Sequence, residues 1–170
     1  MTVLQTERLI LSRLSYDDCE FIYELVNEPV FKRFVGDKQV ATLTDAREYL
    51  KNGPIGSYER HGFGMFRVSV RDGGEPLGIC GLVKREQFAD PDLGFAFLRR
   101  SWAQGYALES AQVVLEYGKK QLGLSRIIAI ADPDNSASVR LIEKLGLEFE
   151  GTVRIEGDTS DINLYATEAN

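Results

Sequence analysis

Residues 72–76 (DGGEP) separate two apolar runs, 63–70 and 77–83. Paired glycines after an aspartate are typical of a hairpin turn, so the two runs are expected to pair as antiparallel strands. Residues 125–131 (SRIIAIA) are almost continuously apolar, which is typical of a strand buried on both faces. Together these features favour a mixed sheet that is covered by helices on both sides.

The remaining patterns predict an α+β fold. Further strands are expected over residues 8–13, 92–98, 148–155 and 161–166, a helix is expected from the 102–107 segment to about residue 122, and a short helix is expected over 135–145. This order is neither a regular repeat of strand, helix and strand nor all-β. It predicts a mixed, mostly antiparallel twisted sheet of about six to seven strands with helices on both faces. One domain over residues 1–170 is expected.

The first half of the chain contains capping and breaking signals. Ser15 is expected to cap a helix that ends before Pro29, and Thr44 to cap a second helix. Residues 53–62 (GPIGSYERHG) are rich in glycine and contain a proline, which interrupt helices and strands. The segment is therefore interpreted as a loop that carries His61 on its surface.

Composition narrows the functional classes. A net charge of -6 argues against general nucleic-acid binding. Cys19 and Cys80 lack metal-site spacing and are interpreted as core thiols, and one histidine excludes a His-rich metal centre, so no metal is expected. The first residues lack a signal-peptide core, and no stretch approaches the ~20 apolar residues that span a bilayer. A cytoplasmic protein with no membrane partner is expected.

Residues 102–107 (WAQGYA) lie between an expected strand and an expected helix. The first N–H groups of a helix have no partners within it, and the helix dipole places positive potential there. The small residues Ala103, Gly105 and Ala107 let this backbone approach a ligand closely. Arg99 and Arg100 add charge upstream. The segment is suited to a diphosphate, with a plain tight connection as the alternative.

A second block, residues 134–147 (DNSASVRLIEKLGL), follows the buried strand. Asn135 and Ser136 are good helix-capping residues. Alternatively, the asparagine and serine side chains of this block project into a cleft beside the sheet.

The two blocks together resemble the GNAT superfamily of acyl-CoA-dependent N-acyltransferases. The family's phosphate loop, Gln/Arg-x-x-Gly-x-Gly/Ala, aligns with 102–107, with Trp102 in place of the leading residue. Trp102 through Glu109 is similar to the Trp-Gly-x-Gly-Tyr-Ala-x-Glu of the RimJ/RimL branch, as is the opening TERLIL with Arg13. The later block matches through Asn135, Ser138, Arg140, Lys144, Leu145 and Gly146.

The resemblance implies a cofactor site on named residues. In the family, the strand before the phosphate loop splays from its neighbour and pairs with pantetheine, a role that falls on Phe97, Leu98 and Arg99. A backbone N–H near Leu98 would polarise the thioester carbonyl. The diphosphate would contact the amides of Ala103, Gln104, Gly105, Tyr106 and Ala107.

The resemblance also implies catalytic residues. The tyrosine that many GNAT enzymes carry seven positions after the asparagine is Ile142 here, which has no proton to donate. The branch's serine maps onto Ser138, whose hydroxyl either lies near the sulfur or packs its helix. Asn135 is expected to contact the cofactor or a bound water.

The general base is poorly specified by the sequence. Asp92 is the preferred candidate because related sequences often hold an acid at that position, and Glu86 is a second. Glu109 is expected to brace the phosphate loop, and a water relay without a single base is the alternative.

The resemblance predicts an acetyl-CoA-dependent N-acetyltransferase. The acceptor would be a primary amine, either a protein N-terminal α-amine or a small molecule, attacking directly in a ternary complex. A non-catalytic acyl-CoA-sensing module and a nucleotide-binding domain of another fold are the alternatives. The protein is expected to be a monomer or a homodimer.

Overall fold

One sheet organises the chain in the computed structural model, which describes residues 2–72 and 74–168. Within these residues the sheet has eight strands in the order β1-β2-β3-β4-β5-β6-β8-β7. Neighbouring strands are antiparallel except β5 and β6, which run parallel. The strands are β1 (Thr2–Gln5), β2 (Leu9–Arg13), β3 (Met65–Val70), β4 (Pro76–Val83), β5 (Asp92–Phe97), β6 (Ile128–Ala131), β7 (Glu148–Val153) and β8 (Ile162–Ala166).

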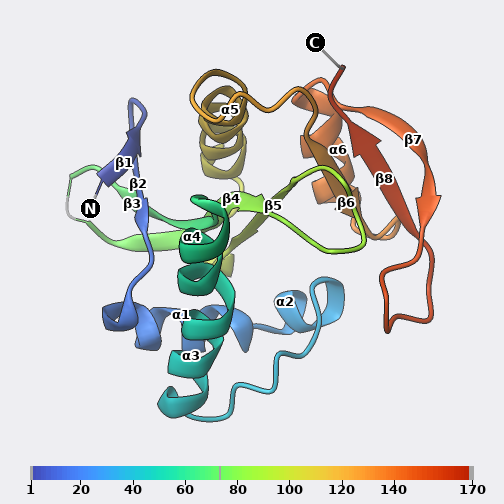
Figure 1. Cartoon of the computed structure of the whole chain (residues 1–170). Coiled ribbons are helices and arrows are strands. Elements are labelled where there is room, and N and C mark those ends of the chain that lie inside the picture. The colour runs from blue at the N-terminus through green and yellow to red at the C-terminus, as the bar shows by residue number, and fades with distance from the viewer. Residues whose placement is uncertain (1, 73, 169–170) are drawn as a thin grey trace.

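Helices cover both faces of this sheet, and the predicted mixed α+β fold is confirmed. The helices α1 and α3 lie on one side of the central strands, and α5 lies on the other (Figure 1). The helices are α1 (Cys19–Val26), α2 (Pro29–Phe34), α3 (Leu43–Leu50), α4 (Gly56–His61), α5 (Tyr106–Lys120) and α6 (Ser136–Lys144).

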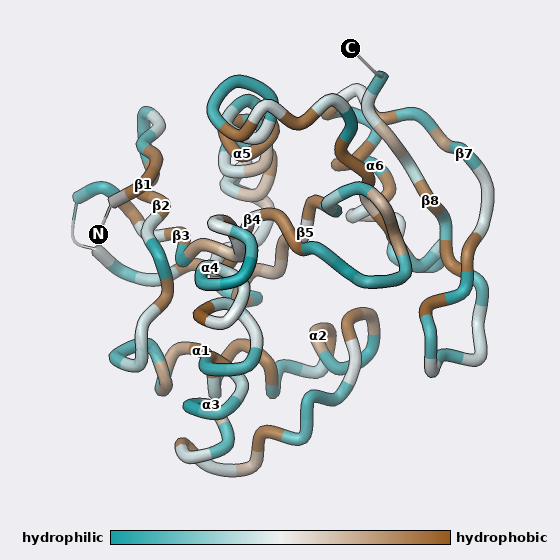
Figure 2. Tube along the Cα trace, viewed as in Figure 1, coloured by the Kyte–Doolittle hydropathy of each residue, from teal (hydrophilic) through white to brown (hydrophobic). Residues whose placement is uncertain are grey.

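The alternation of β4 builds two hydrophobic cores. Cys80 and Leu82 pack with Ala111 and Val114 of α5, whereas Ile79 joins the residues of α1 and α3 on the opposite face. Successive side chains of a strand point to opposite faces, so one strand serves both cores. Figure 2 shows hydrophobic positions gathered in the central strands, while the segment between β4 and β5 is mostly hydrophilic.

Three features of the first half differ from the sequence-based predictions. The strand β1 was not predicted and adds an eighth strand, because its four residues carry too short a pattern. Thr42, not Thr44, caps α3, since its hydroxyl accepts from Asp45 N while the Asp45 carboxylate accepts from Thr42 N. The helix α1 ends at Val26, before Pro29 as predicted, but Pro29 itself begins the short helix α2 as a first-turn proline, which the sequence did not indicate.

The segment interpreted as a loop is helical. A π-helical turn, Lys51–Ile55, continues α3 and holds Pro54 within it, and α4 follows directly and ends at Gly62 with φ 79°. Tyr58 anchors α4 because its hydroxyl accepts from Leu14 N at 3.0 Å and donates to Met65 O. The wider turn accommodates a proline that an ordinary helix would exclude. The loop prediction, which relied on the glycines and this proline, is therefore wrong.

Candidate active site

A gap opens between the two parallel strands. In the described chain, β5 and β6 share the single residue pair Asp92 and Ile128, where Ile128 N donates to Pro91 O. Beyond this point β5 stays paired with β4, and β6 stays paired with β8. The strands therefore splay from Asp92 toward Phe97, as the resemblance implied.

The main chain of β5 directs donors into this gap. Leu98 N donates to Leu77 O at 2.9 Å, and in an antiparallel ladder every second residue turns its main-chain groups toward the partner strand. The groups of Phe95 and Phe97 therefore face away from β4. The Phe97 carbonyl accepts from Trp102 Nε1 at 2.8 Å, so the N–H groups of Phe95 and Phe97 are the donors that point into the gap.

The structure does not support the expected contacts of Leu98 and Arg99. Leu98 is 0% exposed and packs in the core beneath α1 and α3. Its carbonyl accepts from Ser101 N and Oγ, and Arg99 N donates to Glu28 Oε1 at 2.9 Å. These groups are used in closing the turn after β5, so the Leu98 N–H is not available to a thioester, and the nearby main-chain donors that face the gap belong to Phe95 and Phe97.

The segment 102–107 forms the expected turn into α5. Gly105 is the N-cap at φ 80°, and Ala103 is also left-handed at φ 60°. Within the described ranges, no protein group accepts a hydrogen bond from the N–H groups of residues 103–107. Unpartnered amides at the start of a 15-residue helix are suited to an anion.

The two arginines before this turn behave differently from the expectation. Arg100 is paired with Glu24 at 2.6 Å and with Glu75 at 3.5 Å, so its charge is already compensated. The Arg99 guanidinium lies over the Trp102 ring, 4.7 Å from its centroid. Arg100 is therefore a structural ion-pair residue rather than part of the anion site.

A cleft of about 700 Å³ passes beside the gap. Its walls come from β5, β6, the α3–α4 region, the start of α6 and the segment before β8. It brings together Asp92, Asn135 and Ser138, which are far apart in the sequence. Phe95 also lines it, whereas neither cysteine does.

Asn135 and Ser138 share the first turn of α6. The Asn135 side chain caps the helix, since its Oδ1 accepts from Ser138 N at 3.3 Å. Both residues are half-buried and also line the cleft, so capping and a place in the cleft are compatible. Ile142, one turn further, is 1% exposed and belongs to the core.

Asp92 is a buried carboxylate at the start of β5. It is 2% exposed, and its Oδ2 accepts from Arg85 Nε at 2.8 Å. Burial raises the pKa of Asp92 above its ordinary value, and the charge and hydrogen bond of Arg85 oppose that rise. By contrast, Glu86 is exposed. His61 ends α4, is exposed, and stacks on Phe63 at 5.7 Å.

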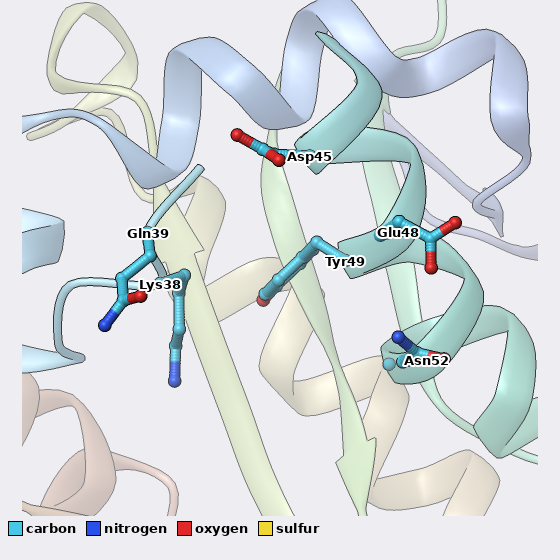
Figure 3. A pocket seen from close by; sticks show the side chains of 7 residues that line it. Lys38, Gln39, Asp45, Glu48, Tyr49 and Asn52 are labelled. Atoms are coloured by element: carbon cyan, nitrogen blue, oxygen red, sulfur yellow. The ribbon is translucent and has the colours of Figure 1, made fainter. Parts of the chain in front are cut away.

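A second hollow of about 440 Å³ adjoins the cleft on its α3 side (Figure 3). The Tyr49 ring points from α3 toward the segment that carries Lys38 and Gln39. Burial raises the pKa of Tyr49, and burial together with the nearby Arg85 lowers the pKa of Lys38. No local motif marks Lys38, Tyr49 or Arg85, so sequence reasoning missed them.

The described residues contain no group of three or more His, Cys, Asp or Glu side chains that is arranged to hold a metal ion. None of the helices in these ranges is long and apolar enough to cross a membrane.

A splayed strand pair beside a helix start with free amides is the arrangement that the resemblance to the acyltransferases implied. A family model for the acetyltransferase (GNAT) domain matches residues 8–148. The chain belongs to this family, and it is an acyltransferase.

Relatives and solved structures agree with this assignment. The chain is 29% identical to the Bacillus subtilis protein described as uncharacterized N-acetyltransferase YoaA, over 96% of this chain and 95% of that protein. It is 35% identical to uncharacterized protein YkkB of the same species, over 90% and 89%. A GNAT acetyltransferase from Bacillus anthracis superposes with a TM-score of 0.81 at 27% identity, covering 99% and 98%.

A ribosomal L7/L12 α-N-protein acetyltransferase, RimL, in complex with coenzyme A has the same fold. Its TM-score is 0.84 at 17% identity, covering 99% of this chain and 98% of that one. At this identity the likeness concerns the fold alone.

Proposed function

We propose that the protein is an acetyl-CoA-dependent N-acetyltransferase acting on a primary amine, either a protein N-terminal α-amine or a small molecule. The amine attacks the thioester directly in a ternary complex. The observation that carries this proposal is the gap between β5 and β6. It places the free main-chain donor of Phe95 and the buried carboxylate of Asp92 on one cleft, and β5 leads from that cleft to the helix start of α5.

The residues present fit acetyl-CoA. The amides of residues 103–107 receive the diphosphate, because they lack partners and lie at the positive end of α5. The Phe97 N–H, which faces the gap, pairs with the pantetheine arm as a neighbouring strand would. Asn135 faces the same arm from the start of α6.

The Phe95 N–H is the proposed donor to the thioester carbonyl. It points into the gap, and Phe95 and Asp92 both line the cleft. A fixed donor aimed at the oxygen that becomes negative stabilises the transition state without reorganisation. This assignment replaces the donor near Leu98 that the resemblance suggested.

Asp92 is the proposed base. An alkyl amine with a pKa of about 8 to 10 arrives mostly protonated and must lose a proton before it attacks. A buried carboxylate held by Arg85 accepts that proton better than an exposed one, because burial weakens its preference for the charged form. Ser138 donates a hydrogen bond to the departing thiolate. Because a thiol pKa near 8.5 already makes the thiolate a fair leaving group, this hydrogen bond helps the reaction without being essential to it.

The acceptor enters from the hollow beside α3. Both recesses share Lys38, Tyr49, Asn52 and Gly53, so the cleft continues outward on the side opposite α5. This route leaves the diphosphate loop clear for the co-substrate, as a ternary complex requires.

A ligand panel followed by a turnover assay tests the proposal. Acetyl-CoA and CoA should raise the melting temperature, whereas NAD and ATP should not. An amine and peptide panel should then yield free thiol in equal amount to acetylated amine. Stabilisation by NAD or ATP alone would contradict the proposal, and acetyl-CoA binding with no turnover on any amine would favour the sensing module.

Direct attack has its own test. Incubation with acetyl-CoA and no acceptor should leave the intact mass of the protein unchanged, because neither cysteine lines the cleft and Cys80 is fully buried. A stoichiometric mass increase of one acetyl group, chased by added amine, would show an acyl-enzyme instead.

A further inference from the structure

We infer that Arg8, in the turn between β1 and β2, is a positioning residue that orients the phosphate-binding loop for the co-substrate. The inference rests on the proposed function, since it concerns the loop that receives the diphosphate. It adds to the site a segment that lies about a hundred residues before that loop in the chain.

Arg8 joins the loop and its helix at three points. Its Nε donates to Glu109 Oε1 at 2.8 Å, and its Nη1 donates to the Gln104 carbonyl at 2.9 Å. Its guanidinium also lies over the Tyr106 ring, 4.6 Å from the centroid. One planar group therefore contacts the residue before the N-cap, the first residue of α5 and its first turn.

The bond to Gln104 sets the direction of the next amide. In a trans peptide unit the carbonyl and the N–H point in opposite directions. When the Gln104 carbonyl is held toward Arg8, the Gly105 N–H must point away from Arg8, on the opposite side of the loop. Gly105 tolerates the φ of 80° that this arrangement needs. Arg8 thus acts from behind the loop rather than as a ligand of the anion.

Charge compensation agrees with a geometric role. Glu109 accepts from Thr6 Oγ1 and from Arg8 N in addition to the Arg8 side chain. Burial alone would raise the pKa of Glu109, but these hydrogen bonds hold that pKa below its ordinary value. The arginine charge is thereby paired with a carboxylate, and what Arg8 contributes to the loop is its fixed fork of donors.

The turn that carries Arg8 is itself well anchored. Thr6 N donates to Leu9 O at 2.9 Å, and Leu9 N donates to Thr6 Oγ1 at 3.0 Å. Leu9 is 0% exposed in the core beneath α5. A rigid turn fixed to the sheet can therefore hold the loop in one conformation.

The experiment compares two acetyl donors. Acetyl-CoA carries the diphosphate, and S-acetylpantetheine lacks it. Arg8→Gln should raise the KM for acetyl-CoA on the order of tenfold, the loss expected for a charged hydrogen bond, while kcat stays near that of the wild type. For S-acetylpantetheine, kcat/KM should stay within about twofold of the wild type.

Arg8→Lys separates geometry from charge, because lysine keeps the charge but not the fork. It should fail to restore the KM, and a full restoration would overturn the positioning role. Arg100→Gln is the matched control. Arg100 also lies before the loop and also forms ion pairs, but its partners are Glu24 and Glu75. It should leave both donors unaffected.

The remaining outcomes each have one meaning. Equal losses for both donors, or an unchanged KM for acetyl-CoA, would overturn the inference. If Arg8→Gln melts far below the wild type, Glu109→Gln tests the same clamp while keeping Arg8, and the same selective loss is expected. Failure of the wild type to bind acetyl-CoA would overturn the proposed function, which the Arg8 variants alone cannot do.

Discussion

Arg85 Nε donates to Asp92 Oδ2 across 2.8 Å, and the two ends of this ion pair differ greatly in exposure. The Asp92 side chain is 3% exposed and that of Arg85 is 41% exposed. The cation therefore remains partly hydrated while the carboxylate is enclosed beside the cleft. This asymmetry is suited to a carboxylate that must accept a proton from a bound amine.

Asp92→Asn should lower kcat by about a hundredfold or more, the usual effect of losing a general base. Asparagine keeps the size of the side chain but cannot accept the proton. The measurement is steady-state kinetics with the acceptor found in the amine panel. Retention of the wild-type kcat would assign deprotonation to a water relay.

Although Asp92→Asn should lose activity, it should not lose stability at pH 7. Because burial raises the pKa of Asp92 in the folded state, its protonated form favours folding at acid pH. That contribution is fully present below the unfolded pKa of about 3.9 and is lost as pH rises through the raised folded value. Asp92→Asn at pH 7 should therefore melt no lower than the wild type, and a large drop would indicate a structural ion pair.

Arg85→Gln should move the acid limb of the pH profile of kcat/KM to higher pH. Arg85 opposes the rise in the pKa of Asp92, so its removal raises that pKa further and the active carboxylate forms later. Arg154→Gln removes an exposed ion pair with Asp161 and is the control that should leave the limb in place. If the acid limb does not move in Arg85→Gln, it reports the titration of a group other than Asp92.

Gly105→Val should weaken acetyl-CoA binding while the protein remains folded. A Cβ at this position lies 3.2 Å from Arg8 Nη2, and the φ of 80° is unfavourable for a branched residue. Gly123→Val is the matched control, because Gly123 has φ 68° after α5 with open space around it. Calorimetric titration should show a loss of acetyl-CoA affinity for Gly105→Val only. Equal affinities of the two variants would show that this loop does not contact the co-substrate.

Ser138→Ala should slow turnover about ten- to a hundredfold, with little change in acetyl-CoA affinity. A hydrogen bond to a developing charge contributes roughly 1.5 to 3 kcal/mol, and it acts mainly in the transition state. Ser136→Ala, exposed in the same helical turn, should keep the wild-type rate. A normal kcat together with a lower melting temperature would make Ser138 a packing residue.

The two helix starts that we propose for the co-substrate could be predicted from local sequence. Gly105 among small residues marks a helix start that a ligand can approach, and Asn135 marks the next one. Such signals depend on a few neighbouring residues, which is why they persist without knowledge of the fold. The hairpin between β3 and β4 is of the same kind. The chemical roles of Asn135, Ser138 and Asp92 stay predictions.

The tertiary structure alone decided which groups remain free and which are paired. The Leu98 N–H donates to the Leu77 carbonyl and Arg100 forms an ion pair with Glu24, although both residues lie where the motif suggested a ligand. The clamp between Arg8 and Glu109 likewise joins segments far apart in the chain. Strand register and side-chain reach depend on long-range packing, so a local pattern marks where a ligand can bind but not which donors remain to bind it.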